Sequence, residues 1–212
     1  MNQLYFKRII EKINYNFIPV YYTKDNSIMG YKIIKDFSPV GFNDKDFMYQ
    51  MAFEEGVFEE FILELLEKAY KIAKEKNLDK FYLFYTLRMN YITDIKEFFN
   101  KIKHIIDDLN LNHDNVIFDI KHIKNWYSFY QKIENSYHYK TILKENRNER
   151  FNIVAIEDAK PDILEFRVIK HYLELKDSLP NTTKLTFNLA HNHGTTVKDL
   201  RNMNIDFYYT YK

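Results

Sequence analysis

Residues 17–34 read FIPVYYTKDNSIMGYKII, two β-rich runs separated by a polar segment. The runs are residues 17–22 and residues 28–34, and both are rich in the Ile, Val, Phe and Tyr residues that favour strands. Between them, Lys24-Asp25-Asn26-Ser27 has the composition of a turn. The stretch therefore predicts a β-hairpin near the start of the chain.

A long amphipathic helix is predicted after the hairpin. Apolar residues between positions 57 and 76 recur at helical spacing and fall on one face. Glu64 and Lys68, and likewise Glu67 and Lys71, stand four residues apart, the spacing of ion pairs on an exposed helix face.

The rest of the chain alternates compact apolar runs with segments of helical period. We expect strands at 81–87, 116–120, 153–156, 163–169, 185–189 and 205–211, and helices at 95–109, 123–137, 171–176 and 195–203. Strands that are apolar on both faces are typical of a parallel sheet covered by helices. Because no Gly-rich phosphate turn follows any run, we expect a TIM-like α/β barrel, degenerate or incomplete, with the hairpin supplying one antiparallel strand.

Composition excludes several classes of protein. The 31 basic and 30 acidic side chains leave a net charge of +1, which gives no reason to expect binding to nucleic acid or to a membrane. The absence of cysteine excludes disulfides and thiolate metal sites. With no signal peptide, no membrane span and no Gly- or Ser-rich linker in the 212 residues, we expect a single cytoplasmic domain, 1–212.

Polar side chains end several of the expected strands, where a barrel carries its reactive groups. Four carboxylates stand out: Asp119, Glu157, Asp158 and Glu165. If they converged, they could hold Mg²⁺ or Mn²⁺, which would bridge a phosphodiester and activate a water.

The order of these motifs resembles that of an EAL domain, the family that hydrolyses cyclic dimeric GMP. Residues 17–34 are similar to its Gln-Pro-Ile-Val strand, hairpin and Gly-Tyr-Glu-Ala-Leu-Leu-Arg. Residues 84–87, 116–122, 155–158, 161–167 and 200–209 resemble, in order, Val-Asn-Leu-Ser, Leu-Glu-Ile-Thr-Glu, Leu-Asp-Asp, Pro-Asp-Tyr-Leu-Lys-Ile-Asp and Leu-Arg-Glu-Leu-Gly-Cys-Asp-Tyr-Val-Gln. The resemblance covers nearly the whole chain and implies a metal-dependent phosphodiesterase fold.

The positions that the resemblance assigns to metal ligands depart from the family. Its first metal-binding Glu falls on Lys32, its Asn on Thr86, and its third-strand Glu on Asp119. The Asp-Asp pair falls on Glu157 and Asp158. An ammonium at a ligand position repels a divalent cation, so the resemblance implies a degenerate site.

Further departures affect the catalytic base and the ligand contacts. The Lys that assists the attacking water falls on Glu165, a late Glu falls near Asn188 or Leu189, and the last Gln falls on Tyr209. Ligand-contacting Gln and Arg residues fall on Ile18 and Asp36, so binding of the dinucleotide is not expected. Only two residues separate Asp158 from the next matching segment, where the family has a loop and helix, so the usual EAL dimer is not expected either.

We therefore expect a catalytically inactive domain that needs no cofactor and regulates by binding another protein. The carboxylates at the carboxyl end of its barrel would be neutralised internally, by Lys32 together with Lys121 or Arg167. Two alternatives stay open: a receptor that binds the dinucleotide without cutting it, and a weak phosphodiesterase that uses Mg²⁺ or Mn²⁺ on the four carboxylates.

Three polar or aromatic segments have simpler interpretations than catalysis. His191-Asn192-His193-Gly194 is interpreted as a turn before a helix capped by Thr195 or Thr196, rather than as a nuclease or metal site. The aromatic residues 125–130 favour a protein-contact surface. The charged residues 144–150 are expected to form a solvated loop.

Overall fold

Eight strands form a closed barrel in the computed structural model, which describes residues 3–41, 45–123, 125–133, 138–145 and 150–211. The strands are β1 (Asn14–Tyr22), β2 (Ile28–Asp36), β3 (Tyr82–Arg88), β4 (Val116–Lys121), β5 (Lys140–Lys144), β6 (Ile163–Phe166), β7 (Lys184–Asn188) and β8 (Phe207–Tyr209). Strand β1 runs antiparallel to β2 and β8, and every other neighbouring pair is parallel. The TIM-like barrel with one antiparallel strand is confirmed, and because the barrel is closed it is not an incomplete one.

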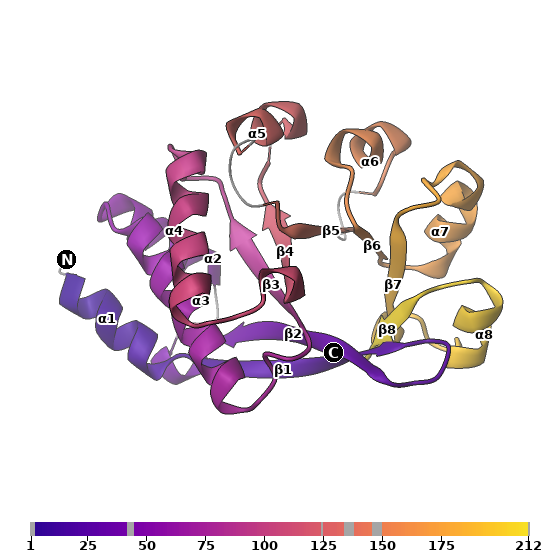
Figure 1. The fold of residues 1–212 in the computed structure, drawn as a ribbon, viewed down its shortest axis with the longest axis horizontal. Helices are drawn as coiled ribbons and strands as arrows, with labels where there is room; N and C mark the ends of the chain where they lie inside the picture. Colours follow the sequence, from indigo (N-terminus) through magenta and orange to yellow (C-terminus); the bar gives the residue numbers. More distant parts are fainter. Residues whose placement is uncertain (1–2, 42–44, 124, 134–137, 146–149, 212) are drawn as a thin grey trace.

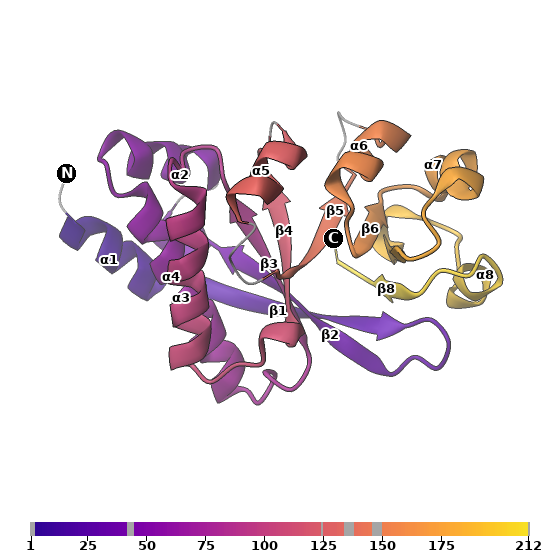
Figure 2. The ribbon, with the colours of Figure 1, turned by 45° about the horizontal axis from the view of Figure 1, so that its top comes forward.

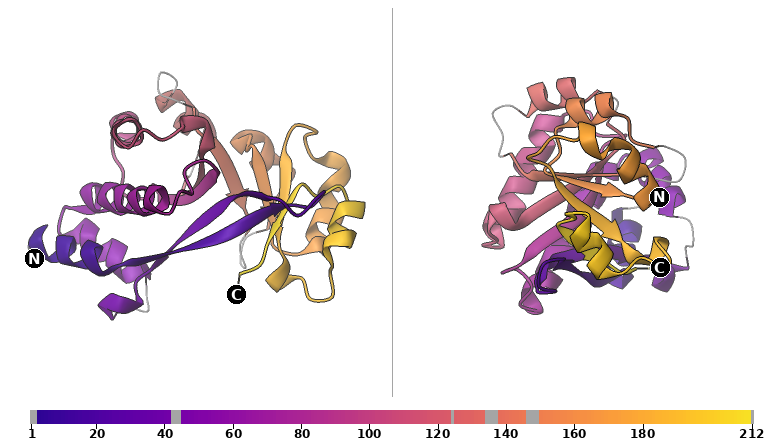
Figure 3. Two further views of the ribbon diagram at one scale, coloured as in Figure 1. Left: turned by 60° about the horizontal axis from the view of Figure 1, so that its bottom comes forward. Right: turned by 90° about the vertical axis from the view of Figure 1, so that its right-hand side faces the viewer.

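Helices surround the barrel on its outside (Figure 1). They are α1 (Gln3–Lys12), α2 (Lys45–Glu54), α3 (Phe58–Glu75), α4 (Ile95–Asp108), α5 (Trp126–Lys132), α6 (Ile153–Ala159), α7 (Ile169–Leu175) and α8 (Val197–Asn202). The long β1–β2 hairpin joins the half of the molecule that carries α1 and α3 to the half that carries α8 (Figure 3). No described helix has the length and apolarity needed to cross a membrane.

The predicted hairpin and the predicted long helix are both present. Gly30 explains how β2 approaches β3 so closely, because a Cβ atom at this position would lie 2.3 Å from the carbonyl oxygen of Tyr82. Helix α3 buries its apolar face and keeps the Glu67–Lys71 ion pair outside. Lys68, in contrast, donates to backbone carbonyls at the end of α1, including Ile10 and Ile13, rather than pairing with Glu64.

The expected strand at 153–156 is wrong, because these residues begin helix α6. Asn152 caps this helix, its side chain accepting a hydrogen bond from the Ala155 amide at 2.7 Å. Ile156 is fully buried against the outer face of β6 and β7. The strand of this region is β5. It is only five residues long and begins and ends with a lysine, so its strand pattern is weak in the sequence.

A helix therefore connects β5 to β6, as in an ordinary βαβ unit. The expectation that this connection had lost its helix is wrong, because α6 lies between β5 and β6. The connection therefore gives no reason to exclude the usual EAL dimer. Helices α1 and α2 were not expected from the sequence. Elsewhere the expected elements are present with shifted ends: the expected helix 123–137 is α5 as far as Lys132, and positions 124 and 134–137 lie outside the described residues.

The core has an inner and an outer part. Inside the barrel, apolar residues including Val20, Met29, Phe84, Ile117 and Ile142 pack together. Outside it, one layer packs α1 to α5 on the first strands, and a second packs α6 to α8 on the last ones. The apolar filling of the interior leaves only the carboxyl end of the barrel, here called the barrel mouth, for polar side chains.

Candidate functional site

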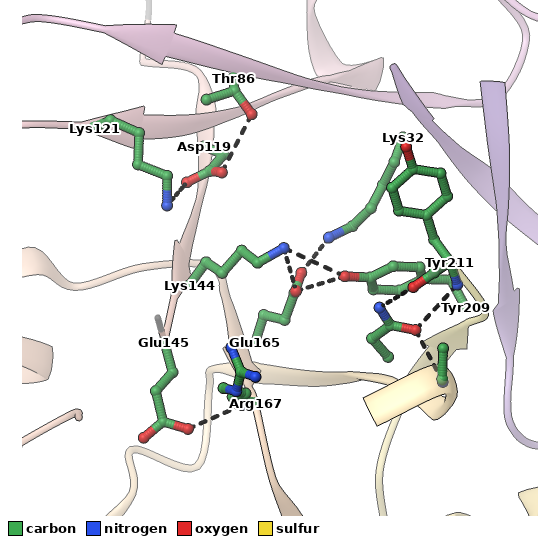
Figure 4. A network of polar contacts seen from close by, with 12 residues as sticks. Lys32, Thr86, Asp119, Lys121, Lys144, Glu145, Glu165, Arg167, Tyr209 and Tyr211 are labelled. Carbon is green, nitrogen blue, oxygen red and sulfur yellow. Dashed lines mark hydrogen bonds and ion pairs between the residues drawn. The ribbon is translucent and has the colours of Figure 1, made fainter. Parts of the chain in front are cut away.

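One buried carboxylate at the barrel mouth is held by three side chains from three other strands. Glu165 of β6 is 2% exposed, and its Oε1 lies 2.8 Å from Nζ of Lys144 on β5. The Tyr209 hydroxyl of β8 donates to the same oxygen at 2.6 Å. Lys32, reaching across from β2, forms an ion pair with Oε2 (Figure 4). These four residues are called the mouth cluster below.

The mouth cluster satisfies Glu165 on both oxygens. Lys32 is 9% exposed, and its Nζ also lies 4.1 Å from the centre of the Tyr209 ring, a cation–π contact. Lys144 Nζ is 3.4 Å from the Tyr209 hydroxyl oxygen. The cluster therefore joins four strands around one anion, as buried charges require.

Burial and the ion pairs shift the pKa values of the lysines and the carboxylate in this cluster. Burial raises the pKa of Glu165, but the two neighbouring ammoniums outweigh it and bring the pKa to about 2. Burial, aided by Lys144, lowers the pKa of Lys32, while Glu165 acts to raise it. Burial also acts to lower the pKa of Lys144, but Glu165 outweighs it and the pKa is raised. Glu165 therefore lies between the two lysines of the mouth cluster.

Tyr209 stays protonated beside this carboxylate. Burial raises its pKa well above the usual range, and the negative charge of Glu165 raises it further. Its hydroxyl group is therefore a permanent hydrogen-bond donor to Glu165 at neutral pH and not a base.

A second, smaller group lies on the neighbouring strands β3 and β4. Thr86 and Asp119 are register partners, and the Thr86 hydroxyl donates to Asp119 Oδ2 at 3.2 Å. Lys121 Nζ lies 3.0 Å from Asp119 Oδ1. The expected neutralisation by Lys32 and Lys121 is therefore present, but the additional cation at Glu165 is Lys144 and not Arg167.

Glu157 and Asp158 are not at the barrel mouth. Both are exposed residues of α6, outside the barrel. The strand end that the resemblance gave to them is occupied by Lys144 and Glu145. The sequence signal that could have located this strand end is the short β-favouring run Thr141-Ile142-Leu143, followed by two charged residues.

Glu145 turns away from the mouth and is buried, so it does not belong to a solvated loop. Its Oε2 accepts the backbone amide of Arg167 at 2.9 Å, and its Oε1 lies 3.0 Å from His171 Nδ1. Residues 146–149 of the expected loop lie outside the described residues. Glu145 therefore ties the end of β5 to the start of α7.

Asn188, rather than Leu189, is the mouth residue of β7. Its amide donates to the Tyr211 carbonyl at 2.7 Å, and its Oδ1 accepts the amides of Ala190 and Tyr211, each at 3.1 Å. Leu189 packs in the outer apolar layer.

The segment around His191 forms the expected turn. A short 3₁₀ helix over Leu189–His191 is followed by Gly194 in the left-handed region and by α8. Thr196 caps α8 in a capping box with Asp199, as one of the two expected caps. Asn192 is buried and donates to two backbone carbonyls, which is a structural role.

The mouth contains a cavity of about 260 Å³. Among the residues that line it are Lys32, Lys144, Asp119, Asn188, His191 and Ile18. Asp36, the position of a ligand-contacting Arg in the family, instead accepts the Ser38 amide at 3.0 Å. The polar lining of this cavity combines lysine and asparagine donors with hydroxyl groups, one histidine and the carboxylate of Asp119.

This donor set does not fit Mg²⁺ or Mn²⁺. Such ions need several free carboxylate or carbonyl oxygens, whereas both oxygens of Glu165 are held by cations. Within the described residues, no group of three or more His, Asp or Glu side chains is placed to hold a metal ion.

Comparisons with known proteins agree with this architecture. No protein-family model matches the sequence, and no curated protein matches it significantly. Among solved structures, the complex of BlrP1 from Klebsiella pneumoniae with calcium and cyclic di-GMP superposes with a TM-score of 0.69 at 11% identity, covering 94% of this chain and 54% of BlrP1. An EAL domain protein from Listeria monocytogenes gives 0.64 at 13% identity, with 100% and 92% covered.

The FimX EAL domain of Xanthomonas citri, in complex with cyclic di-GMP, gives a TM-score of 0.64 at 9% identity, covering 98% of this chain and 92% of the FimX chain. This chain thus spans about half the length of BlrP1 and nearly all of the two single domains. The barrel with its antiparallel first strand and the agreement over nearly the whole chain lead to one conclusion: this chain has the EAL-domain fold.

Proposed function

We propose that this chain is a catalytically inactive EAL-like domain that acts in cyclic di-GMP signalling by binding another protein. The part of the proposal that concerns lost catalysis is supported by the mouth cluster, in which Lys32 and Lys144 hold the carboxylate of Glu165. Metal-dependent phosphodiester hydrolysis needs cations that bind substrate and generate a hydroxide. A lysine supplies charge but no open coordination position for a water.

Three of the four side chains of the mouth cluster do not replace the missing base. A general base should have a pKa close to the working pH, whereas that of Glu165 is about 2. Tyr209 is held protonated, and Lys144, whose pKa is raised, is held charged. None of these groups accepts a proton from water near neutral pH.

A receptor that binds the dinucleotide without cutting it is the second candidate. The two lysines that line the cavity of about 260 Å³ favour this function, because ammonium groups pair well with phosphate oxygens. FimX provides an EAL domain in complex with cyclic di-GMP. Binding of the dinucleotide is disfavoured by Ile18 and Asp36, which stand where the family has a ligand-contacting Gln and Arg.

A phosphodiesterase that uses all four carboxylates is disfavoured by their placement. Asp119 and Glu165 are in the barrel, but Glu157 and Asp158 are on the outer helix α6. An enzyme would have to work without the latter two and displace Lys32 and Lys144 from Glu165.

Calorimetry with cyclic di-GMP, with and without Mg²⁺ or Mn²⁺, separates these functions when the products are analysed by chromatography. We expect no hydrolysis with either metal, and for the leading proposal no binding heat. Tight binding without turnover would support the receptor. Metal-dependent hydrolysis would overturn the proposed loss of catalysis.

A further inference from the structure

A cavity larger than that of the barrel mouth lies away from it, between α5 and α6. Its volume is about 750 Å³, and it opens at the amino ends of β5 and β6, where Lys140, Thr141 and Asp162 line it. The two helices stand side by side on the outside of the barrel (Figure 1, Figure 2). This α5/α6 cleft shares no lining residue with the mouth cavity.

Tyrosine rings form the apolar part of the α5/α6 cleft. Tyr139 is buried, packs against Phe118 and Phe99, and provides a rigid base. The Tyr130 hydroxyl donates to the carbonyl of Ala159 and so fixes the spacing of the two helices at one point. Tyr127, in contrast, is 70% exposed. A large aromatic ring this exposed beside a cleft is typical of a contact surface.

The lining of the cleft has more carboxylates than lysines. Of its two lysines, Lys140 is engaged, with Nζ 2.8 Å from the carbonyl oxygen of Asp114 and over the ring of Tyr82. Asp162 is likewise used, accepting the Thr141 amide at 2.8 Å. The other charged residues of the lining are all exposed: two carboxylates, Glu157 and Asp158, and one ammonium, Lys160.

We propose that the α5/α6 cleft binds a segment of a partner protein that presents an arginine or a lysine flanked by apolar residues. The cation would stack on the Tyr127 ring and pair with Glu157 and Asp158, while the apolar neighbours cover Tyr130 and Tyr139. Arginine fits best, because its planar guanidinium group both stacks and pairs with carboxylates. This inference rests on the proposed protein-binding function and names the partner chemistry.

The probe is the capped tripeptide Ac-Leu-Arg-Leu-NH₂, titrated into ¹⁵N-labelled protein and followed by NMR. We expect the amide shifts to change around Tyr127, Tyr130 and Asp158, and the analogue with citrulline in place of arginine to bind at least tenfold more weakly. Glu157→Lys with Asp158→Lys should weaken the arginine peptide at least fivefold. Glu174→Lys, at an exposed acidic position on α7, is the matched control and should leave binding unchanged.

Equal binding of the citrulline peptide, an unaffected double variant, or shift changes confined to other surfaces would overturn the proposal. The amide spectrum of each variant also reports whether it is folded, because the substituted positions are exposed. The titration contains neither metal nor dinucleotide, so its failure would leave the proposed loss of hydrolysis standing. Conversely, hydrolysis in the calorimetry would refute that loss without touching the peptide result.

Discussion

Exchanging the charges of Lys32 and Glu165 is the sharpest test of the mouth cluster. The pair crosses the barrel from β2 to β6 and is almost fully buried, so Lys32→Glu would place a second carboxylate against Glu165. Lys144, 2.8 Å from Glu165, and the Tyr209 hydroxyl would remain as its partners. The double variant Lys32→Glu, Glu165→Lys would restore opposite charges in the order that the EAL family uses.

Breaking a buried ion pair costs about 3–5 kcal/mol. Because Lys144 compensates in part, we take the lower limit, about 3 kcal/mol, for Lys32→Glu. For a chain of this size that corresponds to a loss of roughly 6 to 12 °C in unfolding temperature. The double variant should regain more than half of this loss, a coupling that a double-mutant cycle measures.

The assay is thermal and urea unfolding followed by circular dichroism in metal-free buffer. Lys71→Glu is the matched control, because Lys71 is paired to Glu67 on the exposed face of α3 and its substitution should cost less than about 1 kcal/mol. If Lys32→Glu unfolds at the same temperature as this control, or if the double variant is no more stable than the single one, the ion-pair account is refuted.

Three further predictions concern stability. The pKa of Glu165 in the folded protein, about 2, lies below the usual value of 4.5, so its contribution to the free energy of unfolding is complete above pH 4.5 and is lost as the pH falls toward 2. Between these limits wild type should lose about 3 kcal/mol more unfolding free energy than Glu165→Gln, and parallel pH profiles would contradict this. Tyr209→Phe removes a hydrogen bond to a charged group and should cost about 1–3 kcal/mol in urea unfolding. Tyr208→Phe, whose hydroxyl donates to exposed Asn26, should cost less than about 0.5 kcal/mol, and equal losses would count against the cluster. Gly30→Ala places a Cβ 2.3 Å from the Tyr82 carbonyl oxygen and should destabilise by about 1–3 kcal/mol, whereas an unchanged urea midpoint would show that β2 and β3 can separate freely.

The sequence predicts the barrel because local signals dominate there. The hairpin at 17–34, the apolar stripe of α3 and the alternation of elements depend on neighbouring residues alone. The pairing of Lys32 with a carboxylate also follows from sequence, since an ammonium in a barrel mouth needs an anion.

The wrong predictions concern segments whose secondary structure is decided by contacts with residues far away in the sequence. Ile153 and Ile156 fit a strand or a helix equally well, and the Asn152 cap together with the apolar face of β6 and β7 makes the segment a helix. Strand β5 is defined by pairing on both edges with β4 and β6 rather than by its five residues. Lys144, the second cation at Glu165, could not be placed without that strand.

If ammonium groups occupy the place of metal ions in the mouth, the wild-type mouth should not bind Mn²⁺, and a Mn²⁺ titration measures this. The spectrum of free Mn²⁺ in electron paramagnetic resonance weakens when the ion binds. Wild type and Glu165→Gln should leave the same free Mn²⁺ signal. The double variant Lys32→Glu, Lys144→Asp, which adds two carboxylates beside Glu165, should remove signal corresponding to one bound ion per chain. If wild type binds one Mn²⁺ and Glu165→Gln abolishes that binding, Glu165 is a metal ligand and the lysines do not occupy the place of the metal.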